Sequence, residues 1–103
     1  APTTEQVLRA KGYDYWALGH IHGRRVLHER PFVVFPGNLQ GRHARETGAK
    51  GCTLVTCEGG RVAAIEHRSV DVLRWAALEV DVAGADAATL DRRIAEAARA
   101  AAA

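Results

Sequence analysis

The sequence predicts an α/β protein of the α+β type, with a mostly antiparallel β-sheet and a short helix at each end. Three observations support this fold class. Short β-prone runs bounded by Gly, Pro and Asn recur through the middle of the chain. Two such runs, 51–57 and 61–68, flank Glu58-Gly59-Gly60 in the pattern of a β-hairpin. Each end of the chain places a capping residue before helix-forming residues.

The first third of the chain predicts one helix and three strands. Thr3 is placed to cap a short helix that Gly12 closes. Residues 13–18 are aromatic and apolar with little polar alternation, which is typical of a strand covered on both faces. Residues 24–29 and 31–35 are two further β-prone runs, broken where a proline fits only a strand start or an edge.

The remaining elements follow from turn chemistry and periodicity. Pro36-Gly37-Asn38 predicts a turn, and the polar residues 39–49, which have no period, predict a surface loop. Alternation of apolar and polar residues predicts a strand over 75–82. Asp86 can cap a last helix with a narrow apolar stripe that includes Leu90 and Ile94.

Composition narrows the classes of protein that the chain can represent. Its 103 residues suffice for one modest core, and a net charge of +2 is too small to imply nucleic acid by bulk electrostatics. No run has the roughly 18 apolar residues that a membrane helix needs, and no signal-peptide layout opens the chain. We therefore expect a cytoplasmic protein. Because the first residues resemble the middle of a protein, we also expect a fragment of a longer chain.

The strongest candidate for chemistry is His20-Ile21-His22, which lies between two glycines. Imidazoles are good ligands for zinc, manganese and iron, but a lone H-x-H is more often a structural or solvated pair, and a catalytic pair is a further alternative. A cupin would place a glutamate three or four residues on, whereas Glu29 is farther away. A metallo-β-lactamase would continue with x-D-H, whereas residues 23–25 are Gly-Arg-Arg. Both alternatives fail at the third ligand.

A longer pattern carries a more specific resemblance. DYWALGHIH at 14–22, followed by FPGNLQGRHARETGAKGCTLV at 35–55, resembles the carboxy-terminal part of the catalytic domain in calcineurin-like metallophosphoesterases of the SbcD/YhaO DNA repair exonuclease type. The resemblance covers roughly residues 3–75. It implies a metallophosphoesterase sandwich, so that 1–75 would be the end of a catalytic domain and 76–103 the start of an accessory or capping domain.

The resemblance also implies cofactors, partners and ligands. Such enzymes hydrolyse phosphodiester bonds in DNA with two divalent metal ions, Mn²⁺ being the expected metal, beside an SbcC-like ATPase subunit. By position, His20 would bind one metal and His22 the other. The family's remaining ligands, including an amino-terminal D-x-H and a bridging aspartate, have no match, so no catalytic residue is assigned and the isolated chain is expected to be inactive.

Three residues are candidates for binding substrate: Asn38, Arg42 and His43. The resemblance brings this loop towards the phosphate, although an arginine in an exposed loop can simply be solvated. Asn38 can donate to substrate or hold the turn through its side chain. The competing hypothesis for the whole chain is a noncatalytic module for assembly or substrate positioning, with an H-x-H that is structural or binds metal weakly.

Overall fold

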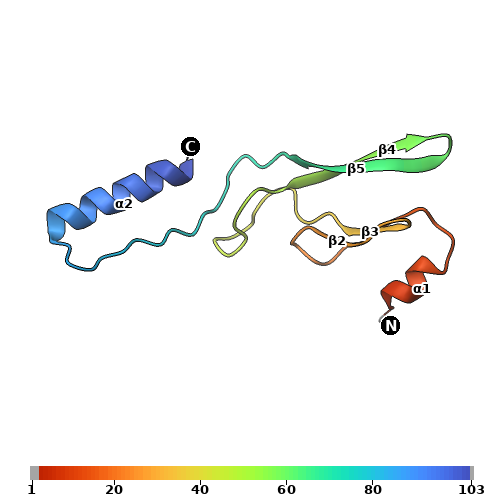
Figure 1. Ribbon diagram of the computed structural model, residues 1–103, viewed down its shortest axis with the longest axis horizontal. Coiled ribbons are helices and arrows are strands. Elements are labelled where there is room, and N and C mark those ends of the chain that lie inside the picture. The colour runs from red at the N-terminus through yellow and green to blue at the C-terminus, as the bar shows by residue number, and fades with distance from the viewer. Residues whose placement is uncertain (1–2, 103) are drawn as a thin grey trace.

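The computed structural model describes residues 3–102 and shows an α+β fold with a helix at each end (Figure 1). The predicted fold class is therefore confirmed. The expected domain ends at positions 1 and 103 lie outside the described residues. The elements in chain order are α1 (Glu5–Arg9), β1 (Tyr15–Ala17), β2 (Arg25–His28), β3 (Phe32–Phe35), β4 (Gly51–Glu58), β5 (Arg61–Ser69) and α2 (Ala87–Ala102).

The buried core lies in a three-stranded sheet with the order β1-β3-β2. β3 pairs parallel with β1, where Tyr15 lies opposite Phe32, and antiparallel with β2. Because β3 is the central strand, Phe32, Val33 and Val34 are buried, the two valines completely. The prediction that 13–18 is covered on both faces is wrong for this chain, since β1 is an edge strand and only half-buried.

Helix α1 is fixed to the sheet by a tryptophan. The indole N–H of Trp16 donates to the carbonyl of Leu8 at 3.0 Å, and the Trp16 ring meets Tyr13 edge-on. The N-cap is Thr4 rather than the predicted Thr3. Thr4 directly precedes the helix and has extended backbone angles, and its hydroxyl accepts from the N–H of Val7 at 3.3 Å.

The predicted hairpin is confirmed as a separate two-stranded antiparallel sheet, β4-β5. Its turn uses Gly59 and Gly60, which both have positive φ, at 56° and 76°. Glycine takes these angles without the steric cost that a Cβ would bring. Antiparallel pairing thus joins β2 to β3 and β4 to β5, with β1-β3 as a parallel pair.

The predicted strand over 75–82 is wrong. Trp75 forms an isolated bridge with Thr47, and residues 76–82 form no strand. Their alternation has no neighbouring strand to pair with in the described chain, because this segment leads away from both sheets (Figure 1). A period of two makes a strand possible, but the backbone groups still need a partner.

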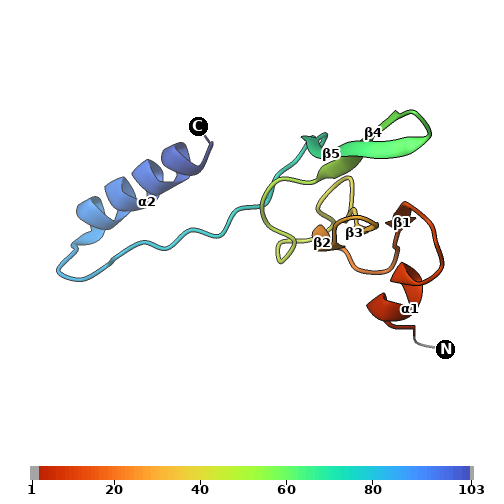
Figure 2. The same ribbon diagram turned by 45° about the vertical axis from the view of Figure 1, so that its right-hand side comes forward.

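Helix α2 lies apart from the sheets at the far end of an elongated molecule of 62 × 31 × 20 Å (Figure 2). The predicted cap is confirmed, since the Asp86 carboxylate accepts from the N–H of Thr89 at 2.8 Å. The predicted apolar stripe does not pack on a sheet: α2 has no buried residue, and Ile94 is 47% exposed. In the described part of the chain, the helices lack the length and apolar character needed to span a membrane.

Candidate metal centre

The histidine pair lies just beyond the carboxyl end of β1. The last sheet bond runs from the N–H of Leu18 to the carbonyl of Val34 at 2.8 Å, and the chain then leaves the sheet. His20 has a positive φ of 82°, a left-handed conformation that histidine adopts more readily than most side chains. His20 and His22 are both exposed, with 52% of the His22 side chain accessible.

The turn at Gly37 docks directly on this histidine segment. The N–H of Asn38 donates to the carbonyl of His22 at 2.9 Å. Gly37 has a φ of 79°, and a Cβ there would lie 2.9 Å from the His22 carbonyl oxygen and 2.8 Å from the Arg24 nitrogen. Glycine is therefore required at this position for two reasons: the positive φ angle and the close approach of two backbone segments.

Glu46 is the centre of the site. Its Oε1 lies 2.5 Å from Nδ1 of His22, and its Oε2 accepts from the backbone N–H of Arg42 at 2.7 Å. The Asn38 amide donates to both carboxylate oxygens at 3.3 Å, and Nε2 of His43 lies 3.6 Å from Oε1. Only 9% of the Glu46 side chain is exposed. The Arg42 N–H and then the His22 hydrogen bond lower the pKa of Glu46 to about 2.

The loop that carries Glu46 is itself held to the segment after β5. Oε1 of Gln40 accepts from the backbone N–H groups of Val72 and Leu73 at 2.9 and 3.1 Å. The Gln40 amide in turn donates to the carbonyl of Leu73. Together with the bridge between Thr47 and Trp75, these bonds tie the loop 39–49 to the segment after β5, while most of its residues are exposed, as predicted for a surface loop.

The structure brings four of the five predicted site residues together: His22, Asn38, Arg42 and His43 all contact Glu46. Their roles in metal and substrate binding stay predictions, as does that of His20, which is not part of this cluster. The backbone N–H of Asn38 holds the turn against His22, and the Asn38 side-chain amide binds the carboxylate of Glu46. Glu46 itself was missed, although it is the sole acidic residue in the basic loop 39–49.

The residues present fit a metal only in part. With Nδ1 of His22 turned to Glu46, its Nε2 is left as the atom that could bind an ion, and His20 adds a second imidazole nearby in sequence. Among residues 3–102 no group of three His, Cys, Asp or Glu side chains could hold a metal ion. His20 and His22 could therefore supply two ligands, and the described residues do not complete a metal site.

A cavity at the histidine segment is small, about 20 Å³, and is lined by residues that include His22, Asn38 and His67. A volume of this size holds about one water molecule, so a substrate would have to lie on the surface. We refer to the segments 18–24 and 36–46 as the histidine end of the three-stranded sheet.

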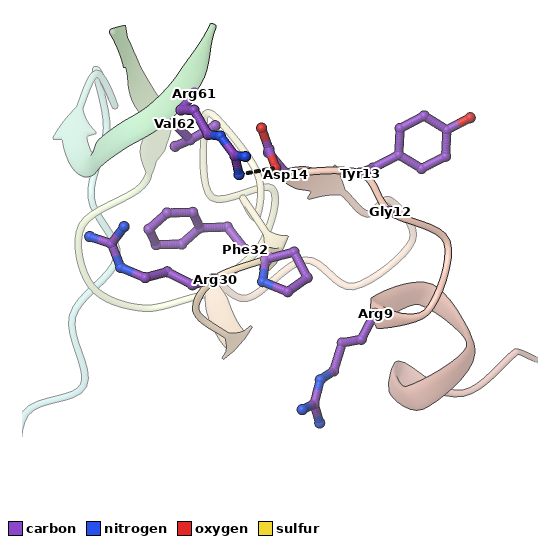
Figure 3. Close-up of a pocket in the computed structure, with 9 residues that line it drawn as sticks. Arg9, Gly12, Tyr13, Asp14, Arg30, Phe32, Arg61 and Val62 are labelled. Atoms are coloured by element: carbon purple, nitrogen blue, oxygen red, sulfur yellow. Dashed lines mark ion pairs between the residues drawn. The ribbon is translucent and has the colours of Figure 1, made fainter. Parts of the chain in front are cut away.

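A pocket of about 360 Å³ lies at the opposite end of the same strands, where β1 and β3 begin (Figure 3). Its lining includes Arg9, Arg30 and Arg61, and we refer to it as the arginine end. The three guanidinium groups do not converge: Arg61 points to Asp14, at 3.8 Å, while Arg9 and Arg30 extend in other directions (Figure 3). The pocket thus has volume, but its guanidinium groups are not arranged to bind one anion together.

The chain is similar in sequence to a known metallophosphoesterase. The structure defines an α+β chain whose exposed histidine segment rests on a carboxylate-centred loop. Over 82 residues, or 79% of its length, the chain is 50% identical to the "Uncharacterized metallophosphoesterase YhaO" of Bacillus subtilis (strain 168). The matched region covers 20% of the length of that protein, so the chain spans about a fifth of it. No protein-family model and no solved structure matches the chain.

Proposed function

We propose that this chain is part of a metal-dependent phosphodiesterase of the DNA repair exonuclease type, in which His20 and His22 each bind one of two divalent ions. The observation that supports the proposal most directly is the convergence of His22, Asn38 and Arg42 on Glu46. Sequence resemblance alone assigned these residues to metal and substrate, and in the structure they share one carboxylate. The expected metal is Mn²⁺.

The two parts of the site have different tasks in this proposal. Two bound ions roughly 3.5–4 Å apart would clamp a phosphodiester and lower the pKa of a bound water. The chain's own contribution is to hold an imidazole outward at His22 and to fix the backbone beside it. Arg42 is exposed, and Glu46 holds only its backbone, so the guanidinium remains available for a phosphate.

For the chain on its own, one observation favours the alternative of a noncatalytic module. The described residues hold no group of three side chains suited to a metal, so two ions at clamp distance would lack most of their ligands. We therefore propose that the 103-residue chain alone has no phosphodiesterase activity. DNA as substrate, an SbcC-like ATPase as partner and a cytoplasmic location belong to the same proposal for the complete protein.

Metal-dependent turnover tests the function. In a longer protein that carries this chain with the missing ligand motifs, Mn²⁺-dependent cleavage of DNA ends and of bis-p-nitrophenyl phosphate is expected. His20→Ala and His22→Ala should each abolish it, because loss of a metal ligand removes several kcal/mol of charge stabilisation. Arg61→Ala, at the arginine end, is the matched control and should keep the parental rate. Near-parental turnover in both histidine variants would exclude the metal role.

Substrate binding tests the loop separately. Arg42→Ala should weaken DNA affinity and lower the logarithmic salt slope by about one unit, because one phosphate contact is lost. Turnover at saturating DNA should fall much less. Binding constants over a salt series, measured for the parent, Arg42→Ala and Arg61→Ala, provide the comparison. An unchanged slope with a collapsed rate would assign Arg42 to catalysis, and no change in either would show a solvated side chain.

A further inference from the structure

Glu46 links the two halves of the histidine end through its two oxygens. Oε1 faces Nδ1 of His22 at 2.5 Å, on the proposed metal side. Oε2 takes the backbone N–H of Arg42 at 2.7 Å, on the proposed substrate side. The Asn38 amide bonds both oxygens and so fixes the plane of the carboxylate. One side chain therefore sets the relative position of an imidazole and a phosphate-facing loop.

The chemistry of these contacts determines where the His22 proton lies. An ionised carboxylate can only accept hydrogen bonds, so Nδ1 of His22 must carry the hydrogen that it shares with Oε1. In the neutral ring the lone pair is then on Nε2, whereas an imidazole in water prefers the opposite tautomer. A second hydrogen bond of this kind is the usual way in which proteins fix the tautomer and orientation of a metal-binding histidine.

Two further observations indicate that the contact is built into the fold. Glu46 is 9% exposed although its loop is polar, so its carboxylate cannot turn freely to water. The backbone on each side of the contact is also held: Asn38 bonds the His22 carbonyl, and a Cβ at Gly41 would lie 2.8 Å from the Glu46 carbonyl oxygen. The positions of both partners are thus fixed independently of their mutual hydrogen bond.

We infer that Glu46 is a positioning residue. It holds His22 in the Nδ1–H form, with Nε2 presented for a divalent cation, and it fixes the position of the Arg42 backbone relative to His22. This inference rests on the proposed function, because it gives the site its ligand atom. It adds a residue that the resemblance did not supply. His20, which lacks such a partner among the described contacts, would be oriented by the left-handed backbone alone.

The tautomer can be read without any metal. In the ¹⁵N-labelled chain at about pH 8, above the ordinary histidine pKa, long-range ¹H–¹⁵N spectra distinguish the two neutral tautomers. His22 is expected in the Nδ1–H form. His28 is an internal positive control, because its Nδ1 lies 2.8 Å from the carbonyl oxygen of Pro31 and must donate to it. His22 in the Nε2–H form would overturn the inference.

Variants of Glu46 provide the second part of the test. Glu46→Ala should return His22 to the Nε2–H form, while an unchanged His28 signal reports that the sheet is intact. Glu46→Gln retains an acceptor and should rescue part of the Nδ1–H population, which a general loss of structure would not do. If Glu46→Ala unfolds the chain, Glu46→Gln and Glu46→Asp carry the comparison. An Nδ1–H population of His22 that is equal in the parent and in every folded variant, including Glu46→Gln, would overturn the inference.

Mn²⁺ titration of a longer protein, which carries this chain with the missing ligand motifs, separates this inference from the proposed function. Paramagnetic broadening should reach the His22 ring in that protein, and Glu46→Ala should lower the apparent Mn²⁺ affinity by about 10-fold or more. Broadening with equal affinity in parent and variant would overturn the positioning role while leaving the metal site. The Nδ1–H form without any broadening would instead count against the proposed metal site, with the Glu46–His22 contact retained.

Discussion

The two ends of the three-stranded sheet differ in what they offer a ligand. The arginine end has a pocket of about 360 Å³, whereas the cavity at the histidine end is about 20 Å³. Yet the larger hollow is lined by guanidinium groups that point apart, and the smaller one borders a carboxylate with four polar neighbours. Convergence of hydrogen-bonding groups, rather than volume, marks the candidate site in this molecule.

The difference extends to the backbone. At the histidine end, Gly37 has no space for a Cβ, because the His22 carbonyl and the Arg24 nitrogen lie against it. At the arginine end, Gly12 has an equally positive φ of 84° but nothing within 4 Å of a Cβ. Two glycines with the same conformation therefore have different packing roles, and this pair gives the sharpest test of the comparison.

The largest effect is expected for Gly37→Ala. The left-handed conformation costs roughly 1–2 kcal/mol for alanine, and overpacking adds about 1–3 kcal/mol. Gly12→Ala meets only the first cost. Urea unfolding of both variants beside the parent measures the difference, and chemical shifts of His22 report whether the turn has moved. Equal destabilisation by the two substitutions would show that the segments at the histidine end are not in tight contact.

A smaller effect is expected in acid. Hydrogen bonds lower the pKa of Glu46 to about 2, and the Arg74 side chain lowers the pKa of Asp71 to about 2. Because both folded-state values lie below the ordinary 4.5 and 3.8, the stability they contribute is complete above those values and is lost as the pH falls towards 2. Glu46→Gln and Asp71→Asn should each flatten the pH dependence of unfolding.

The control for the acid experiment is Glu96→Gln, which removes an exposed carboxylate on α2, away from the histidine end. Urea midpoints measured from about pH 6 to pH 2 cover the range in which both groups bind protons. Stability that rises on acidification, or the same slope in all variants, would contradict the hydrogen-bonding pattern at the histidine end.

The smallest effect is expected at the arginine end. The ion pair between Arg61 and Asp14 spans 3.8 Å, and the two side chains are 81% and 47% exposed. Such pairs contribute about 0–1 kcal/mol, because water screens the attraction and the side chains lose freedom. Arg61→Ala should therefore shift the urea midpoint little. A loss above about 1 kcal/mol would indicate that the pocket is more ordered than its open arrangement suggests.

The sequence by itself determined the local elements of this protein. Gly59-Gly60 between two β-prone runs was sufficient for the hairpin, and Asp86 before an alanine-rich segment was sufficient for the cap of α2. The H-x-H segment and the basic loop were also visible as candidates. These features depend on backbone preference and on hydrogen bonds between near neighbours, which a short stretch of residues encodes completely.

Only the tertiary structure decided which candidates meet. Glu46 lies 24 residues from His22, and no spacing rule links them; the turn at Gly37 brings them together. The parallel pairing of β1 with β3, which buries Val33 and Val34, is likewise a long-range choice. The same reason explains the missing strand over 75–82. Its alternation satisfied a local pattern, but a strand exists only where another backbone supplies its hydrogen bonds.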